Sequence, residues 1–257
     1  MISKKKLIVI QGPTASGKTA LGVMLAKHFD TEIISADSRQ FYKEMAIGTA
    51  KPNAVEMDGV VHHFIDSHSI LNPISAFKFA EEANKLIKKE LKTKSTILIV
   101  GGSGLYIEAL TKGFNDIPHD PLIKEEIIND YKKNGLQPFL EEIEMKDPDF
   151  YESMDKKNTH RVLRSLEAIR ISNKTMSELR NSSKIESDYE LKTYTLMPER
   201  PFLYDLINDR VDLMMQNGLL DEVKSLLKHR DLRTLKTVGY TELFTYLDGE
   251  LYLGGFT

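Results

Sequence analysis

The 257-residue chain contains no cysteine, which excludes disulfides, thiolate catalysis and zinc sites built on cysteine. It also lacks an excess of positive charge, because 35 Lys and Arg stand against 38 Asp and Glu. Any contact with a nucleic acid must therefore come from a local basic patch. No apolar run approaches the length of a membrane span, and the run behind residues 4–6 is too short for a signal peptide. We therefore expect a cytoplasmic protein without membrane contact.

A glycine-rich loop that fits G-x-x-x-x-G-K-T carries the strongest signal in the sequence. The flanking pattern predicts a buried strand at 7–10 and a helix at 20–29, which argues against a chance match. Such a loop aims backbone N–H groups and a positive helix end at one anion. Lys18 adds a point charge, and the Thr19 hydroxyl can reach a magnesium ion. Mg²⁺ is the one cofactor that we predict, and Thr19 is its one predicted protein ligand. The loop predicts a bound diphosphate or triphosphate, as in nucleotide-binding and ATP-binding proteins. Its residues are Gly12, Pro13, Thr14, Ala15, Ser16, Gly17, Lys18 and Thr19.

Strand-like and helix-like segments alternate through residues 1–112. Further strands are expected at 32–35, 60–65 and 97–100, and further helices at 75–91 and 103–110. This alternation is typical of βα units around a parallel sheet. We therefore predict an α/β fold, a P-loop NTPase-like parallel sheet flanked by helices. Ligands of such sheets lie at the carboxyl ends of the strands, so the loop, Asp37 and Ser103 should share one rim.

Strand signals vanish between residues 113 and 188, and helical patterns replace them. Helices are expected there at 121–134, 137–145 and 158–172. The chain then returns with one strand at 191–197 and helices at 201–217, 219–227 and 241–247. We predict a P-loop catalytic core of residues 1–112 and 189–257, interrupted by an all-helical insertion at 113–188.

Asp37 follows a buried strand on the predicted rim. A carboxylate there is a magnesium-side ligand, a binder of a substrate hydroxyl or a general base, or else it caps the next short helix. Many P-loop ATPases carry an Asp after the strand at 97–100, but here Gly101 and Gly102 follow it, which weakens an ATPase interpretation. His62 and His63 are adjacent on an expected strand and point to opposite faces, so we do not expect them to bind one metal.

Residues 156–174 hold six Lys or Arg and one acidic residue, Glu167. On a helix, Arg161 and Arg164 lie one turn apart, away from the apolar stripe. Two such arginines suit bidentate contacts with phosphates. A solvated basic face is the alternative, and charge alone does not decide between the two.

Several motifs in fixed order resemble the tRNA dimethylallyltransferase family over nearly the whole chain. The motifs are residues 12–19, Asp37-Ser38-Arg39-Gln40 with Tyr42, Ile47-Gly48-Thr49-Ala50-Lys51-Pro52, His62-His63-Phe64, Gly101-Gly102-Ser103-Gly104-Leu105-Tyr106, Arg161-Val162-Leu163-Arg164-Ser165-Leu166-Glu167 and Val238-Gly239-Tyr240. The resemblance implies transfer of a dimethylallyl group from dimethylallyl diphosphate to the exocyclic N6 amine of the adenosine 3′ to the anticodon in tRNA, with release of diphosphate.

The resemblance also implies roles for individual residues. Asp37, Lys18 and Ser103 would be catalytic, with Asp37 as the general base. The family usually has threonine in place of Ser103 and glutamine in place of His160. Contacts with the anticodon stem-loop of tRNA are implied for Asp37, Ser38, Arg39, Gln40, Ser103, Lys124, His160, Arg161, Val162, Leu163 and Arg164.

Two other functions remain open on the residues alone. A P-loop kinase of a small metabolite would consume ATP, and a prenyltransferase acting on free adenine nucleotide would turn over without tRNA. We expect a monomer. Family members usually continue with a basic helix beyond residues 246–250, whereas residues 251–257 are without a basic residue, so we expect weaker tRNA binding than in a chain with that helix.

Overall fold

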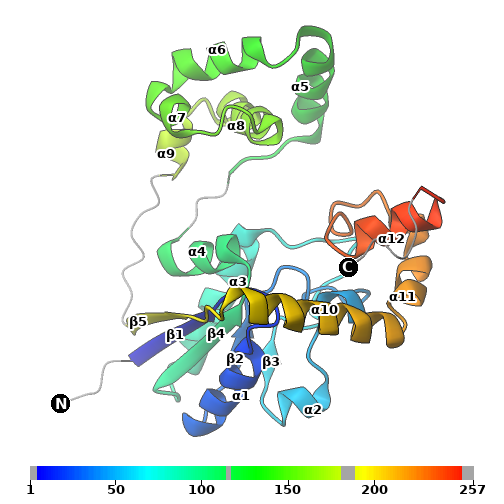
Figure 1. The fold of residues 1–257 in the computed structure, drawn as a ribbon. Coiled ribbons are helices and arrows are strands. Elements are labelled where there is room, and N and C mark those ends of the chain that lie inside the picture. Colours follow the sequence, from blue (N-terminus) through cyan, green and yellow to red (C-terminus); the bar gives the residue numbers. More distant parts are fainter. Residues whose placement is uncertain (1–4, 114–116, 181–188, 251–257) are drawn as a thin grey trace. The chain divides into compact units, whose positions relative to one another are not determined.

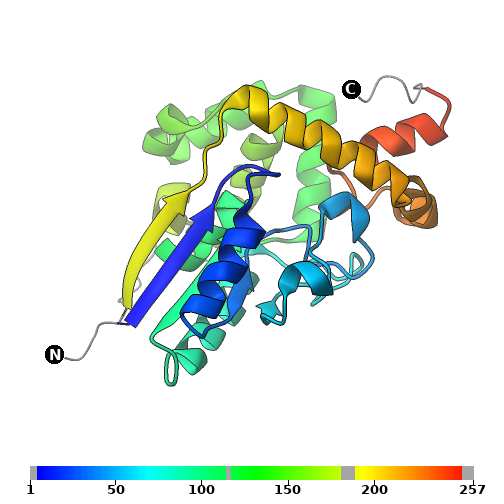
Figure 2. The same cartoon turned by 60° about the horizontal axis from the view of Figure 1, so that its bottom comes forward.

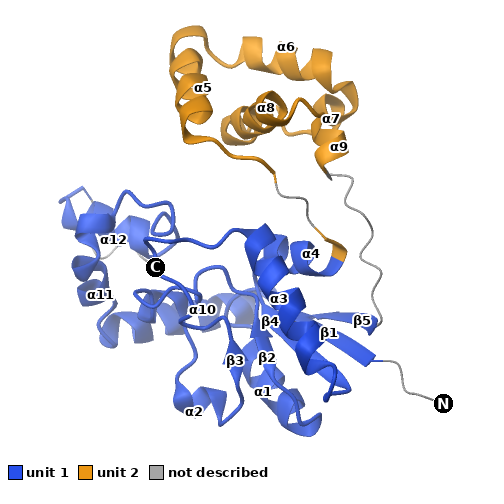
Figure 3. Cartoon of the chain, turned by 180° about the vertical axis from the view of Figure 1, so that it is seen from behind, with its two compact units in different colours: residues 1–111, 186–257 blue, residues 112–185 orange. Residues whose placement is uncertain are grey.

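The computed structural model describes residues 5–113, 117–180 and 189–250. Residues 251–257, the ends of the expected insertion at 114–116 and 181–188, and residues 1–4 lie outside the described residues. The chain divides into two compact units, residues 1–111 with 186–257 and residues 112–185 (Figure 3).

The first unit is built on a five-stranded parallel sheet (Figure 1). Its spatial order is β3-β2-β4-β1-β5. The strands are β1 (Lys5–Gln11), β2 (Ile33–Ser35), β3 (His62–His63), β4 (Thr96–Gly101) and β5 (Tyr189–Thr195). The predicted α/β class with a parallel sheet flanked by helices is confirmed.

The central strands are apolar because both of their faces are covered, as parallel sheets require. Ile8 and Ile10 of β1 face the helix α1 (Lys18–His28), which packs on them through Val23 and Ala26. Leu7 and Val9 point the other way and are also fully buried. Figure 2 shows α1 against one side of the strands. The helices α3 (Ala76–Glu90) and α4 (Gly104–Lys112) lie on the opposite side in Figures 1 and 3.

Some predicted boundaries are wrong. The strand expected at 60–65 is only two residues long, because Phe64 and Asp66 adopt positive φ angles of 70° and 52°, which end extended pairing. A short helix, α2 (Ala54–Met57), was not expected. It is held by a capping box between Asn53 and Glu56.

In the described part of the chain, three helices follow β5 in the first unit: α10 (Arg200–Gln216), α11 (Leu219–Ser225) and α12 (Tyr240–Leu247), with a 3-10 turn η2 (Leu227–His229) between the last two. α11 contacts both α12 and the 3-10 turn η1 (Ile47–Thr49). A helix from the C-terminal part of the first unit, α11, therefore contacts the loop that follows β2.

The second unit is all-helical. It contains α5 (Pro121–Asn134), α6 (Gln137–Lys146), α7 (Pro148–Ser153), α8 (Thr159–Ser172) and α9 (Met176–Arg180). Its own core gathers Ile127, Phe139, Ile143, Val162 and Leu166. Among the described residues of both units, none of the helices has the length and apolar character needed to cross a membrane.

Candidate active site

A cavity of about 1000 Å³ opens at the carboxyl end of the sheet in the first unit. All of residues 12–19, together with residues 37–40 and Ser103, line it. The sequence motifs of the first unit that were expected on one rim are therefore brought to one site. The remaining expected residues, Lys124 and residues 160–164, belong to the second unit.

The glycine-rich loop bends back on its own backbone between β1 and α1. Gly17 has a φ of 82° and caps α1, a conformation that costs little only for glycine. The Ser16 hydroxyl and the Lys18 ammonium both donate to the Pro13 carbonyl, at 2.8 and 2.5 Å. The loop therefore presents the start of α1 and its lysine to the cavity, which is the geometry of an anion site.

Lys18 lies among charges that tune it. Burial lowers the pKa of its ammonium, Asp37 opposes that effect, and Arg210 lowers the pKa further. A cation that burial destabilises gains strongly from an incoming anion, because the attraction between the opposite charges offsets part of the desolvation penalty. The electrostatics therefore favour a negatively charged ligand beside Lys18.

Arg210 is a site residue that the sequence reasoning missed. It comes from α10, lines the cavity and donates from Nη1 to the Thr14 hydroxyl at 2.9 Å. The guanidinium thus adds a second cation to the anion site, with planar donors suited to phosphate oxygens. No local pattern singles it out, because α10 has no buried residue against which one of its charges would stand out.

Asp37 sits at the turn that follows β2. Its Oδ1 accepts the backbone N–H of Arg39 at 3.0 Å, a local contact within a turn. The expected alternative, a cap of the next short helix, is not what forms, because residues 38–44 contain no helix. The turn contact is compatible with a functional role, because Asp37 also lines the cavity and a carboxylate has a second oxygen. The turn fixes the carboxylate, and that oxygen can face a substrate.

Ser103 is tied to the same turn. Its hydroxyl oxygen accepts the Ser38 N–H at 2.8 Å and donates to the Ser38 hydroxyl at 3.1 Å. Gly101, at the end of β4, lies so close to Ala36 that a Cβ would come within 2.3 Å of the Ala36 carbonyl oxygen. An acidic side chain cannot occupy Gly101 without moving the backbone, which accounts for the missing ATPase-type carboxylate.

Backbone carbonyls hold the side chains of the two residues that follow Ser38. Arg39 donates from Nη1 to the carbonyl of Thr234 at 2.8 Å, and Gln40 donates from Nε2 to the carbonyls of Thr49 and Ala50, both at 3.1 Å. Arg39 therefore connects the site to the chain that precedes α12, and Gln40 connects it to the turn η1.

The expected tRNA contacts of the second unit differ among themselves. Lys124, His160 and Arg161 are exposed. Val162 is fully buried in the helical core, with Leu163 packed against that core, so the Val162 side chain has no surface to offer.

Arg164 departs from the simple picture of a basic face. It donates to the carbonyls of Pro118 and Ile117 at 2.6 and 2.8 Å, and pairs with Glu167 at 3.1 Å. Glu167 is 2% exposed. Both guanidinium NH₂ groups are therefore engaged inside the second unit.

The donor set fits magnesium only in part. Among the described residues there is no cluster of three or more His, Asp or Glu that could hold a metal. Thr19, the last residue of the loop, lines the cavity. Mg²⁺ is often held by few protein groups together with phosphate oxygens and water, and one hydroxyl beside a diphosphate is consistent with such coordination. His62 and His63 make separate contacts, with the Val60 carbonyl at 3.0 Å and with Glu32 at 2.5 Å.

Comparison with known proteins identifies the family. The IPP transferase family matches residues 40–255. The chain belongs to the IPP transferase family. The tRNA dimethylallyltransferase of Christiangramia forsetii is 43% identical over 245 residues, which are 95% of this chain and 81% of that protein. The tRNA dimethylallyltransferase 1 of Bacteroides thetaiotaomicron is 41% identical, over 95% of this chain and 80% of the relative.

A solved structure is also similar. The full-length tRNA isopentenylpyrophosphate transferase from Bacillus halodurans matches with a TM-score of 0.67 and 38% identity, over 98% of this chain and 80% of its own. The family resemblance drawn from the motifs and the predicted enzyme class, a prenyl transferase, are therefore confirmed.

Proposed function

We propose that this IPP transferase moves a dimethylallyl group from dimethylallyl diphosphate to the N6 amine of the adenosine 3′ to the anticodon of tRNA, releasing diphosphate. One observation carries the proposal. A single cavity joins an anion site with two cations, Lys18 and Arg210, to the carboxylate of Asp37. A diphosphate leaving group needs the cations, and an amine nucleophile needs the carboxylate.

The anion site supports cleavage of the donor. As the allylic C–O bond breaks, its electron pair stays on the diphosphate, so negative charge builds there. Backbone N–H groups at the start of α1, the Lys18 ammonium and the Arg210 guanidinium would stabilise this charge. Mg²⁺ held by the Thr19 hydroxyl and diphosphate oxygens would supply further charge neutralisation when bound.

Asp37 completes the transfer on the acceptor side. A bond forms between N6 and the allylic carbon, and nitrogen then carries an excess proton. Asp37 would take that proton, as a positioned general base. No water has to attack a γ-phosphate, so the reaction has no need of a carboxylate at Gly101, where the backbone of Ala36 leaves no room for one.

The base has to leave the anticodon stack to reach a cavity, as in other enzymes that act on a base. We propose that the exposed Lys124, His160 and Arg161 of the helical unit contact tRNA phosphates. Their side chains face solvent, as such contacts require.

The test uses dimethylallyl diphosphate labelled in the prenyl group and three reactions, with tRNA, with AMP or with no acceptor. We expect label only in tRNA, at the adenosine 3′ to the anticodon. Label in AMP would show that free adenine nucleotide is the acceptor. Acceptor-dependent hydrolysis of ATP, measured in parallel, would support a kinase and overturn the proposal.

A further inference from the structure

Glu222 of α11 accepts hydrogen bonds from three successive backbone N–H groups at the start of the turn η1. Its Oε2 accepts the N–H of Ala46 and Ile47 at 3.0 and 2.8 Å, and its Oε1 accepts the N–H of Gly48 at 3.1 Å. A carboxylate that accepts several backbone N–H groups makes charge-assisted bonds, stronger than neutral ones. The Glu222 side chain therefore fixes the shape of a loop 174 positions earlier in the chain.

Tyr240 locks the carboxylate from the other side. Its hydroxyl donates to Glu222 Oε1 at 2.5 Å, and its ring is fully buried. Burial, together with the negative charge of Glu222, raises the pKa of this phenol, so it remains a donor. A Cβ on Gly48 would come within 2.5 Å of the ring. The turn thus lies directly on the tyrosine.

The C-terminal end of the same turn contacts the side chain of Gln40, a residue that lines the cavity. The side-chain amide faces the carbonyls of Thr49 and Ala50, both 3.1 Å from Nε2. Carbonyl oxygens only accept hydrogen bonds, so the NH₂ end must face them. Within the described part of the chain no donor is in contact with Oε1, and this oxygen is left as a hydrogen-bond acceptor.

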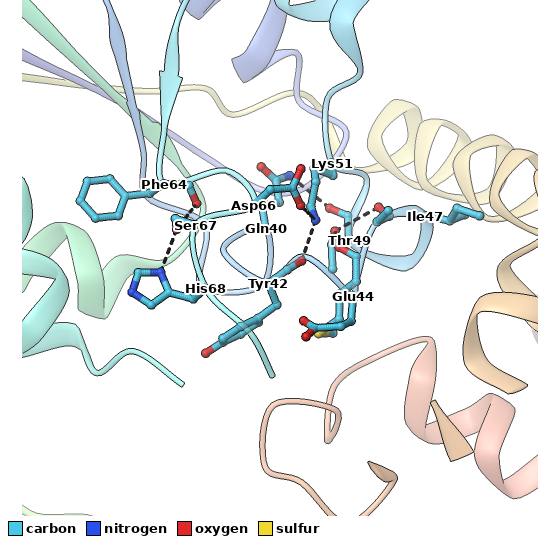
Figure 4. Close-up of polar contacts among 12 residues, drawn as sticks. Gln40, Tyr42, Glu44, Ile47, Thr49, Lys51, Phe64, Asp66, Ser67 and His68 are labelled. Atoms are coloured by element: carbon cyan, nitrogen blue, oxygen red, sulfur yellow. Dashed lines mark hydrogen bonds and ion pairs between the residues drawn. The ribbon is translucent and has the colours of Figure 1, made fainter. Parts of the chain in front are cut away.

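A buried lysine anchors the chain just after the turn. Lys51 donates to the Tyr42 carbonyl at 2.6 Å and to Asp66 at 2.5 Å, and only 6% of its side chain is exposed (Figure 4). Figure 4 also shows Gln40 close to Thr49 and Lys51. Glu222 at one end and Lys51 at the other therefore leave the carbonyls that orient Gln40 little freedom.

We propose that Glu222, braced by Tyr240, is a positioning residue that sets Gln40 to read the exocyclic amine of the acceptor base. The inference rests on the proposed function. An aromatic amine has two N–H bonds in the plane of its ring. Asp37 and Gln40 both line the cavity, and the Asp37 carboxylate and the Gln40 Oε1 can each accept one of these N–H groups. With both N–H groups held, the face of the nitrogen is free to meet the allylic carbon.

The test compares two anticodon stem-loops that differ only in adenine or unsubstituted purine at the acceptor position. Binding is measured without donor. The purine lacks the amine, so the ratio of the two affinities reports the reading of that group. In the unmodified protein this ratio includes the contacts of both N–H groups, with Asp37 and with Gln40. The Gln40 contact, one hydrogen bond to a neutral acceptor, corresponds to roughly a two- to tenfold share of it.

Glu222→Gln is the first variant, because the amide keeps the shape but turns an NH₂ group toward a backbone N–H or the Tyr240 hydroxyl. We expect the adenine preference to fall by the share that Gln40 contributes, roughly two- to tenfold, while the part due to Asp37 and the KM for dimethylallyl diphosphate stay unchanged. Asp221→Asn is the matched control. It removes the neighbouring carboxylate, which is 82% exposed and pairs only with Lys224 among the described residues, and should keep the preference.

Two further measurements separate positioning from general support. In a Gln40→Met background, Glu222→Gln should change the preference no further, since contacts that act through one another are not additive. Tyr240→Phe, a milder change, should speed amide exchange at residues 46–48 and lower the preference partway. It also serves if Glu222→Gln does not fold.

Failure of the inference is distinguishable from failure of the proposed function. An unmodified protein that transfers no label to tRNA overturns both. If that protein transfers label but Glu222→Gln and Tyr240→Phe keep the full adenine preference, the brace does not position Gln40. Equal losses of affinity for both stem-loops in these variants would also overturn the positioning role.

Discussion

Arg210 donates from Nη1 to the Thr14 hydroxyl at 2.9 Å, although 196 positions separate them in the chain. This contact joins α10 to the middle of the glycine-rich loop. It means that the anion site is completed only when the chain returns from the helical unit to the sheet, and that a cation far from the loop motif belongs to the same site.

Replacing Arg210 by glutamine should weaken the use of dimethylallyl diphosphate. A hydrogen bond to a charged group contributes about 1.5–3 kcal/mol, so kcat/KM for the donor should fall roughly 10- to 100-fold. Steady-state kinetics with varied donor and saturating tRNA measure this. Arg200→Gln, an exposed change on the first turn of the same helix, is the control. Equal kinetics of the two variants would remove Arg210 from the anion site.

The pH dependence of donor use should follow Lys18. Burial and Arg210 lower the pKa of its ammonium, and Asp37 raises it. The charge that binds diphosphate is thus lost, as pH rises, below the pH at which an ordinary lysine loses it. The pH profile of kcat/KM reports the free enzyme, so its alkaline limb should show this.

Two variants should move that limb in opposite directions. Arg210→Gln removes a repulsive charge, which raises the pKa of Lys18 and shifts the limb to higher pH. Asp37→Asn removes an attractive charge and shifts the limb to lower pH, within its residual activity. Shifts in the same direction would contradict the assignment of the limb to Lys18.

Asp37→Asn should lose about 10²–10⁴ in turnover, the usual contribution of a positioned acid or base. Asparagine can still accept the Arg39 N–H that holds the turn, so the fold of the site should persist. Single-turnover transfer measures the chemical step, and equilibrium binding of dimethylallyl diphosphate should be nearly intact. Transfer at the normal rate would show that another group takes the proton.

The continuous apolar runs of β1 and β4 and the glycine-rich loop were predictable because each is a local pattern with one physical solution. Arg210 was not, because α10 has no buried residue and nothing local distinguishes one of its charges from another. Arg164 shows the converse. Its helical spacing correctly placed it off the apolar stripe, but the carbonyls that capture it come from residues 117 and 118, which no periodicity of α8 reveals.

Gly101 offers a test of the close approach between strand β4 and the turn that carries Asp37. A Cβ there would come within 2.3 Å of the Ala36 carbonyl oxygen, whereas a Cβ on Gly102 would meet its nearest atom at 3.5 Å. Gly101→Ala should therefore destabilise the protein by about 1–3 kcal/mol, as overpacking does. Gly102→Ala should be nearly neutral. Denaturant unfolding compares the two, and equal stabilities would refute the steric account of the missing carboxylate.

The last prediction separates the two arginines of α8. Arg164 holds the carbonyls of residues 117 and 118 and faces the buried carboxylate of Glu167. Glu167 keeps two other donors, His119 and the Asp120 N–H, and the Arg164 side chain is 35% exposed. Arg164→Ala should therefore cost about 1–3 kcal/mol of stability rather than more.

Arg161 is exposed on the same helix and provides the matched variant. Arg161→Ala should leave the melting temperature unchanged and reduce the salt slope of tRNA binding by roughly one unit, the effect of one lost phosphate contact. Thermal unfolding and stem-loop affinity at several salt concentrations are measured for both variants. Arg164→Lys should rescue little, because an ammonium cannot reach two carbonyls and a carboxylate as a planar guanidinium does. If Arg164→Ala instead keeps its stability and flattens the salt slope, then Arg164 binds phosphate, and the contacts with residues 117 and 118 contribute nothing to the helical unit.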